Sequence, residues 1–156
     1  AGVRSGRHGS GDAVRRAVEI VRPQIDRKQQ TLTLSLPDKA ARVLGDDARL
    51  QQVIVNVAVN GMEAMMSVQD RERVLFVCTQ TDQSDRILVA VADTGIGIEP
   101  ENLNRLFGAF YTTKPGGLGM GLAICRSIIE SHGGRIWISP GIERGSVFHF
   151  TIPAQH

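Results

Sequence analysis

The stretch 93–122 decides the fold: it opens with Asp93-Thr94-Gly95-Ile96-Gly97-Ile98 and closes with Gly116-Gly117-Leu118-Gly119-Met120-Gly121-Leu122. The second glycine-rich turn runs directly into an apolar segment, which predicts a helix beginning near Gly119. Glycines let backbone N–H groups approach an anion because no Cβ stands in the way. The first turn of a helix adds unpaired N–H donors and the positive end of the helix dipole. This stretch therefore predicts a phosphate-binding site.

Two predicted strands precede the first glycine turn. Residues 73–81 favour one strand, residues 82–85 a turn, and residues 86–93 the returning strand. Because residues 87–92 are apolar throughout, we expect the second strand to be covered on both faces or nearly so. It ends at Asp93, at the mouth of the glycine turn. A carboxylate at that point is either a turn residue or cap, or a group that faces a ligand.

Residues 46–67 form the longest periodic run and predict a helix with Asp46 as its N-cap. A polar stripe crosses the apolar surface of this helix. The stripe consists of Gln52, Asn56, Asn60 and Glu63. Asparagine is a poor helix former, so two asparagines one turn apart need a reason. The stripe faces either solvent or a ligand, and an amide oxygen is a hard ligand suited to Mg²⁺.

Further elements lie on either side of these segments. Asp12 can cap a first helix that contains Pro23, and residues 31–36 alternate as a strand does. After the first glycine turn, residues 99–106 favour a short helix, and residues 107–118 have the composition of a mobile lid.

The end of the chain predicts a last helix and two strands. The helix spans residues 119–131 and ends at a Gly133-Gly134 cap. Its expected apolar face consists of Leu122, Ala123, Ile124, Ile128 and Ile129. Strands at 135–139 and 146–152 form a hairpin, with His149 on the exposed face. The order of elements predicts an α/β two-layer sandwich, in which helices cover one face of a mixed, mostly antiparallel sheet.

The composition bounds the class of protein. At 156 residues, with 42% apolar and 22% charged residues, the chain fits one globular domain. We expect residues 1–11 to be a disordered tail or a non-native remnant, and residues 12–156 to be the domain. A net charge of +2 gives no argument for nucleic acid or a membrane surface as a partner. Cys78 and Cys125 are isolated, which favours buried reduced thiols.

Familiar phosphate-binding motifs other than these two turns are absent from the sequence. It contains no Gly-x-x-x-x-Gly-Lys-Ser/Thr segment, and the glycines at 117, 119 and 121 lack the Rossmann spacing. It also lacks the His-Arg-Asp and Asp-Phe-Gly signatures of eukaryotic-type kinases.

Four segments resemble, in family order, the N, G1, F and G2 boxes of the catalytic ATP-binding domain of bacterial two-component sensor histidine kinases. They are residues 52–64, 93–98, 106–114 and 117–122. This resemblance covers about residues 12–153 and implies the Bergerat fold, which gyrase, a heat-shock chaperone ATPase and mismatch-repair ATPases share. One departure is Gly61, where the family usually has alanine; glycine should weaken the helix by about 1 kcal/mol.

The resemblance implies that ATP and Mg²⁺ are the cofactors, and it suggests a role for each ambiguous residue. Asp93 would accept a hydrogen bond from the adenine amino group, Asn60 would bind Mg²⁺, and Asn56 would contact the phosphates. Lys114 would meet the γ-phosphate from the lid, so Asn56, Asn60 and Lys114 are the implied catalytic residues. The other implied nucleotide-binding residues are Gly95, Gly97, Thr113, Gly117, Leu118, Gly119, Met120, Gly121 and Leu122.

The family's phosphoacceptor histidine is followed by Glu or Asp and, a few residues on, by Pro. None of His8, His132, His149 and His156 has this context. The resemblance therefore implies the kinase half of a larger sensor, whose partners are a dimerisation and phosphoacceptor domain and, indirectly, a response regulator. We expect this fragment to be cytoplasmic, even where the parent is membrane-anchored. The alternatives are a serine kinase of the anti-sigma type on the same fold and a degenerate nucleotide-binding interaction module.

Overall fold

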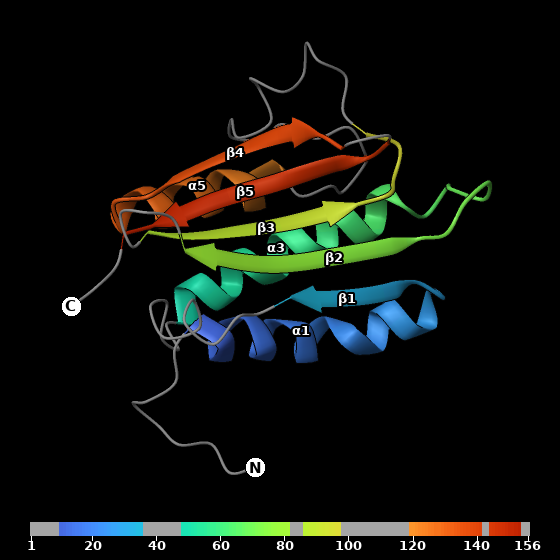
Figure 1. The fold of residues 1–156 in the computed structure, drawn as a ribbon, viewed down its shortest axis with the longest axis horizontal. Coiled ribbons are helices and arrows are strands. Elements are labelled where there is room, and N and C mark those ends of the chain that lie inside the picture. Colours follow the sequence, from blue (N-terminus) through green and yellow to red (C-terminus); the bar gives the residue numbers. More distant parts are fainter. Residues whose placement is uncertain (1–9, 36–47, 82–85, 98–118, 142–143, 154–156) are drawn as a thin grey trace.

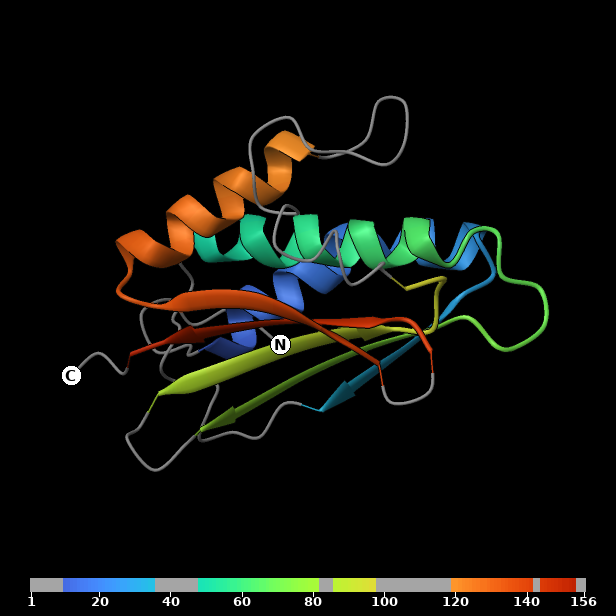
Figure 2. The same ribbon diagram turned by 90° about the horizontal axis from the view of Figure 1, so that it is seen from above.

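The computed structural model describes residues 10–35, 48–81, 86–97, 119–141 and 144–153. The elements in chain order are α1 (Ser10–Arg27), β1 (Thr31–Ser35), α3 (Ala48–Ala64), β2 (Val74–Thr81), β3 (Ile87–Asp93), α5 (Gly119–Ser131), β4 (Arg135–Pro140) and β5 (Ser146–Ile152). The helices lie on one face of the sheet, and no described element covers the other face (Figure 1, Figure 2). The predicted α/β two-layer sandwich is confirmed.

The sheet has five strands in the order β1-β2-β3-β5-β4. β1 runs parallel to β2, with Leu32 opposite Leu75, and the other three pairs are antiparallel. A parallel pair needs a long crossover connection, and α3 lies within it. The sheet is therefore mixed and mostly antiparallel, as predicted.

The helix α3 packs against α1 on one side and α5 on the other. Its buried residues recur at helical spacing: Leu50, Val53, Ile54, Val57, Ala58, Gly61 and Met62. It ends at Ala64, three residues before the predicted end, because Met65 and Met66 bond to carbonyls only three residues back and tighten the last turn. The predicted N-cap Asp46 lies outside the described residues.

The start of α1 differs from the sequence pattern, because Ser10 and Gly11, which we expected in a tail, already belong to this helix, whereas α5 agrees with its predicted bounds. α1 begins at Ser10, before the predicted cap Asp12, and continues through Pro23. α5 spans the predicted residues and ends at Ser131; beyond its end Gly133 has φ 80°, and the Gly134 N–H bonds to the carbonyl of Ile129. This pattern is a Schellman motif, in which a left-handed residue lets the next amide satisfy a terminal carbonyl. None of the described helices is long and apolar enough to cross a membrane.

Three expectations about burial were wrong. Cys78, expected to be buried, is on the outer face of β2 and is only half-buried. β3 is covered on one face only: Ile87, Val89 and Val91 are buried under the helices, whereas residues at 88, 90 and 92 are half-exposed. An apolar run is tolerated because two of those outer residues are small alanines and neighbouring strands shield them. In α5, Ile124 is 48% exposed and Cys125 is fully buried. Helical spacing from Leu122 and Ile129 places the small apolar thiol on the inner face.

Candidate functional site

The carboxylate of Asp93 ends β3 on the helix-covered side of the sheet and is 5% exposed. The Gly95 backbone N–H donates to Oδ1 at 2.8 Å, and the Ser146 hydroxyl donates to Oδ2 at 3.1 Å. Burial raises the pKa of Asp93 above its ordinary value of 3.8, and these hydrogen bonds oppose that shift. The Ser146 backbone N–H also bonds to this carboxylate, so three donors hold its two oxygens, while the low-dielectric surroundings strengthen any further contact that the oxygens make.

Both predicted roles of Asp93 fit this geometry. The bond from Gly95, two residues further along, is the contact of an Asx-turn, so Asp93 does shape the turn. An ionised carboxylate has about four lone-pair sites, and the three bonds from Gly95 and Ser146 leave about one of them. The remaining site can accept a hydrogen bond from a ligand.

The first glycine turn rests on the end of α3. A Cβ at Gly95 would lie 2.5 Å from the carbonyl oxygen of Ala64, and the Ile96 N–H bonds to that same oxygen. On the other side of Asp93, Gly145 has φ 77°, and a Cβ there would collide with the Asp93 carbonyl. Glycine is therefore required at both positions for backbone packing around Asp93.

The asparagines of the α3 stripe are half-buried, whereas Gln52 at its start is exposed. The Asn56 amide is bonded at both ends: Gln52 donates to its Oδ1 at 3.0 Å, and its Nδ2 donates to the Cys125 sulfur at 3.6 Å. Asn60 donates from Nδ2 to the Asn56 carbonyl at 3.1 Å. Within the described part of the chain, no donor reaches Asn60 Oδ1, so this oxygen is the better candidate for a cation.

The thiol of Cys125 takes part in this contact as a neutral group. Burial raises its pKa to about 11, against a smaller lowering effect of the bond from Asn56. A thiol that stays protonated is not a nucleophile, which agrees with the predicted role of a buried cysteine without chemistry.

Gly61, the residue after Asn60 in α3, packs against Asp93. A Cβ at Gly61 would lie 3.4 Å from Asp93 Cβ and 2.8 Å from Leu75 Cδ1. The departure from alanine at this position therefore has a packing consequence, since glycine leaves more room beside the carboxylate. The structure thus brings the predicted Mg²⁺ ligand and the predicted base acceptor to one end of α3.

The predicted second half of the site is described only in part. Gly119, Met120 and Gly121 form the first turn of α5, and Leu122 is a core residue at 4% exposure. The remaining predicted residues Thr113, Lys114, Gly117 and Leu118, together with the 106–114 segment and the 107–118 lid, lie outside the described residues.

Sequence reasoning missed some residues around Asp93. Ser146 contacts the carboxylate directly, and the Gly145-Ser146 pair at the start of β5 was a usable signal. Arg71, in the loop between α3 and β2, donates to the carbonyls of Thr94 and Gly95. Nothing in the local pattern around Arg71 distinguishes it from other loop arginines.

The described residues contain no group of three or more His, Cys, Asp or Glu side chains that could hold a metal ion. Mg²⁺ in phosphate-transfer sites usually takes one or two protein oxygens and completes its shell with substrate phosphates and water. A single amide oxygen such as Asn60 Oδ1 fits that kind of ion, bound together with a nucleotide.

Comparisons with known proteins agree with this geometry. Residues 45–156 match the family described as histidine kinase-, DNA gyrase B-, and HSP90-like ATPase. The chain is 46% identical over 123 residues to the sensor protein FixL of Bradyrhizobium diazoefficiens, which covers 79% of this chain and 24% of FixL. The catalytic domain of histidine kinase ThkA, solved without nucleotide, has a TM-score of 0.79 at 31% identity and covers 92% of this chain and 91% of its own. Full-length ShkA in complex with AMPPNP has a TM-score of 0.80 at 25% identity over all of this chain and 33% of ShkA.

The sheet, the buried carboxylate before a glycine turn and the family match together define the class: the chain belongs to the family of histidine kinase-, DNA gyrase B- and HSP90-like ATPases. Within that class it is similar to sensor histidine kinases, and the likeness to the ThkA catalytic domain extends over about nine tenths of both chains. The chain spans about a quarter of the length of FixL.

Proposed function

We propose that this chain binds Mg²⁺–ATP and transfers the γ-phosphoryl group to a histidine on a separate dimerisation and phosphoacceptor domain. The observation that carries the proposal is the Asp93 carboxylate, which is buried, held by donors from Gly95 and Ser146, and packed against Gly61, the residue after Asn60 in α3. A buried acceptor is suited to the adenine amino group. Structures of ThkA and ShkA, the latter with AMPPNP, support the same assignment by similarity.

In this proposal the chain's own residues bind and orient the nucleotide. Asp93 fixes the base, Asn60 holds the metal, and the first turn of α5, from Gly119, offers backbone N–H groups to the phosphates. Bound Mg²⁺ would neutralise charge on the phosphates, which is the main chemical requirement of phosphoryl transfer. Lys114 would add a positive charge from the lid.

The described histidines support an acceptor outside this chain. His149 stacks on Trp137 with ring centroids 5.0 Å apart, and its Nε2 lies 2.8 Å from the Ser139 hydroxyl. His132 Nδ1 lies 2.8 Å from the Ile128 carbonyl at the end of α5. His8 and His156 lie outside the described residues. Both described rings therefore have structural contacts that account for them.

The partners follow from the same proposal. The phosphorylated domain would pass its phosphoryl group to a response regulator, and ThkA has been solved in complex with the response regulator protein TrrA. A cytoplasmic location would supply ATP. The two alternative functions lose support because the relatives that match this chain are sensor kinases.

Two measurements test the proposal. Calorimetry with AMPPNP should show saturable binding that tightens when Mg²⁺ is added. Incubation with γ-labelled ATP should leave the isolated chain unlabelled, because the acceptor is elsewhere. Absence of nucleotide binding would contradict the binding step, and acid-labile label on a histidine of this chain would contradict the separate acceptor.

A further inference from the structure

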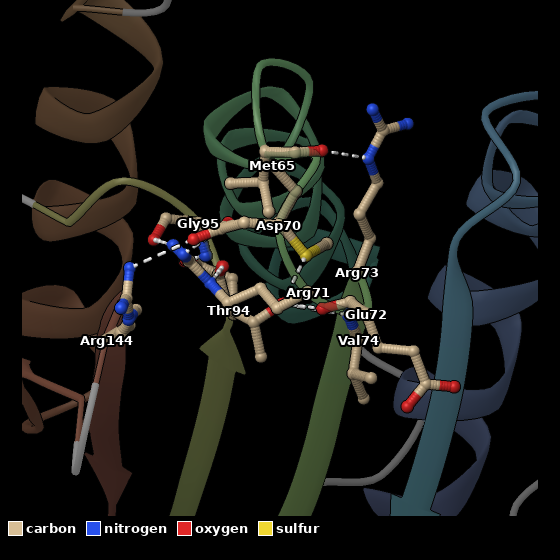
Figure 3. Close-up of polar contacts among 11 residues, drawn as sticks. Met65, Asp70, Arg71, Glu72, Arg73, Val74, Thr94, Gly95 and Arg144 are labelled. Carbon is tan, nitrogen blue, oxygen red and sulfur yellow. Dashed lines mark hydrogen bonds and ion pairs between the residues drawn. The ribbon is translucent and has the colours of Figure 1, made fainter.

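Arg71 makes an unusual set of contacts for a loop arginine, and its side chain is only 23% exposed. Its Nε donates to the Thr94 carbonyl at 2.9 Å, and its Nη2 donates to the Gly95 carbonyl at 2.8 Å (Figure 3). The third nitrogen, Nη1, pairs with Asp70 at 2.9 Å. Two neighbouring backbone carbonyls of the glycine turn are therefore held by one rigid guanidinium.

The first of these carbonyls belongs to the peptide that holds Asp93. In the Thr94–Gly95 peptide, the carbonyl accepts from Arg71 and the N–H donates to Asp93 Oδ1. A peptide unit is planar, so fixing the direction of its carbonyl also fixes the direction of its N–H. Arg71 thus sets the orientation of the donor that aims the carboxylate, although it does not touch Asp93.

The second carbonyl, that of Gly95, belongs to a peptide that is held at both ends in the same way. In the Gly95–Ile96 peptide, the carbonyl accepts from Arg71 and the N–H donates to Ala64, the last residue of α3. The fork of Arg71 therefore fixes two successive peptides, one of which aims Asp93 while the other anchors the turn on the helix that carries Asn60.

Thr94 holds the turn to the same loop through its own side chain (Figure 3). Its hydroxyl donates to the Glu72 carbonyl at 2.8 Å and accepts from the Val74 N–H at 3.0 Å. These bonds and those of Arg71 connect residues 71–74 with Thr94 and Gly95; we call this set of contacts the Arg71–Thr94 clasp.

We infer that Arg71 is a positioning residue for base recognition: through the Arg71–Thr94 clasp it orients the Gly95 N–H, and thereby Asp93, toward the nucleotide base. This inference rests on the proposed function, since it assumes that Asp93 accepts a hydrogen bond from adenine. A charged donor also polarises the peptide it binds, which strengthens the N–H bond on the other side. Lysine keeps the charge but cannot span two carbonyls with a planar fork.

Arg73, two residues along, is a matched control. Its Nε donates to the Val68 carbonyl at 2.9 Å, and its Nη1 and Nη2 donate to the carbonyls of Lys28 and Met66 at 3.2 Å each. It therefore makes the same kind of backbone contacts from the same loop. None of those peptides bonds to Asp93, so a change at Arg73 tests the loss of loop stability without the effect on Asp93.

The test is displacement of a fluorescent nucleotide by ATP and by GTP, in Mg²⁺, for the unmutated protein, Arg71→Lys and Arg73→Lys. We expect Arg71→Lys to weaken ATP about tenfold and to change GTP less than about twofold, so that the ATP-to-GTP preference falls several-fold. Arg73→Lys should lower the melting temperature and leave that preference unchanged. The Gly95 amide should also lose protection from hydrogen exchange in Arg71→Lys alone.

The experiment distinguishes a failure of the proposed function from a failure of the inference about Arg71. If the unmutated protein does not bind ATP, the proposed function is wrong, and the inference with it. If the unmutated protein prefers ATP and folded Arg71→Lys keeps the same preference, Arg71 only stabilises the loop and the inference is overturned. If Arg71→Lys does not fold, Thr94→Val decides, because it removes the hydroxyl contacts of the clasp: a reduced preference supports the inference, and an unchanged one overturns it.

Discussion

Asp93 and His149 lie on opposite faces of the sheet, and burial pushes both toward their neutral forms. The pKa of Asp93, on the helix-covered face at the end of β3, is raised by burial. The pKa of His149, on the other face in β5, is lowered by burial. In each case the surroundings penalise the charged form.

The two groups differ in what their surroundings offer a charge. Asp93 accepts hydrogen bonds from the Gly95 N–H and from the hydroxyl and N–H of Ser146, which favour its ionised form, and it stands at a glycine turn. His149 stacks on Trp137, and its Nδ1 is buried without a partner among the described residues. A buried group whose ionised form is stabilised by hydrogen-bond donors, such as Asp93, is a candidate for ligand binding. A buried group that stacks on an aromatic ring, such as His149, contributes to packing instead.

The largest expected effect is that of Asp93→Asn. Losing the charged acceptor should weaken ATP binding by about tenfold or more, since a hydrogen bond to a charged group contributes about 1.5–3 kcal/mol. The raised pKa shows that the charge of Asp93 is itself costly in the folded state, so removal of the charge should leave the protein folded. Calorimetry and thermal denaturation measure both. Asp26→Asn, at an exposed carboxylate of α1, is the control, and unchanged ATP binding in Asp93→Asn would make Asp93 a turn residue only.

Asn60→Ala should abolish the tightening of ATP binding by Mg²⁺. Alanine removes the amide oxygen and improves helix propensity, so the fold should remain intact. ATP titrations with Mg²⁺ and with a chelator measure the effect, and Gln24→Ala, at a half-buried amide of α1, is the control. An unchanged magnesium dependence would place the metal on another residue, with Asn56 the next to test.

The preference for ATP over GTP should fall as the pH is lowered, beginning above the ordinary Asp value of 3.8. Because the pKa of Asp93 is raised, its carboxylate takes up a proton at a higher pH than an exposed one would. A protonated carboxyl can donate to the guanine carbonyl and no longer rejects it. ATP and GTP carry the same triphosphate, so protonation of the phosphates changes both affinities equally and leaves their ratio unaffected. A preference that is constant to about pH 4 would contradict this.

The smallest effect concerns His149→Phe. The lowered pKa of His149 gives stability that is present above about pH 6.5 and is lost as the pH falls through the folded pKa. Phenylalanine keeps the stack on Trp137 and cannot be protonated, so stability should fall less between pH 7 and pH 5 than in the unmutated protein. Nucleotide binding should not change, and a loss of binding would show that the two faces are coupled.

Local patterns in the sequence predicted the features that depend on residues close together in the chain. Alternation and helical spacing predicted the strands and α3, and the Asp93–Gly97 segment marked the turn. The contacts that define the site join distant residues: Ser146 and Asp93 are 53 positions apart, and Arg71 and Gly95 are 24 apart. No periodicity reports such pairs, because strand order and register decide them.

Contacts between distant residues also explain why the burial of His149, on the face of the sheet away from the helices, was not predicted. Alternation placed His149 opposite the buried phenylalanines of β5, which is correct, but it did not predict that the ring is half-buried. The β4–β5 register sets Trp137 directly opposite His149, and the two rings stack. Cross-strand pairing of this kind becomes visible only when the register is known.

The central claim, that Asp93 reads adenine, is tested most directly by competition of ATP and GTP for a fluorescent nucleotide on the unmutated protein. Adenine offers an amino group where guanine offers a carbonyl oxygen, so GTP would set acceptor against acceptor in a buried site. Leaving such a group unpaired costs about 1–3 kcal/mol, and about 1.4 kcal/mol corresponds to a factor of ten. We expect a preference for ATP of at least roughly tenfold. Equal displacement by the two nucleotides would contradict it and would mean that a group other than Asp93 reads the base.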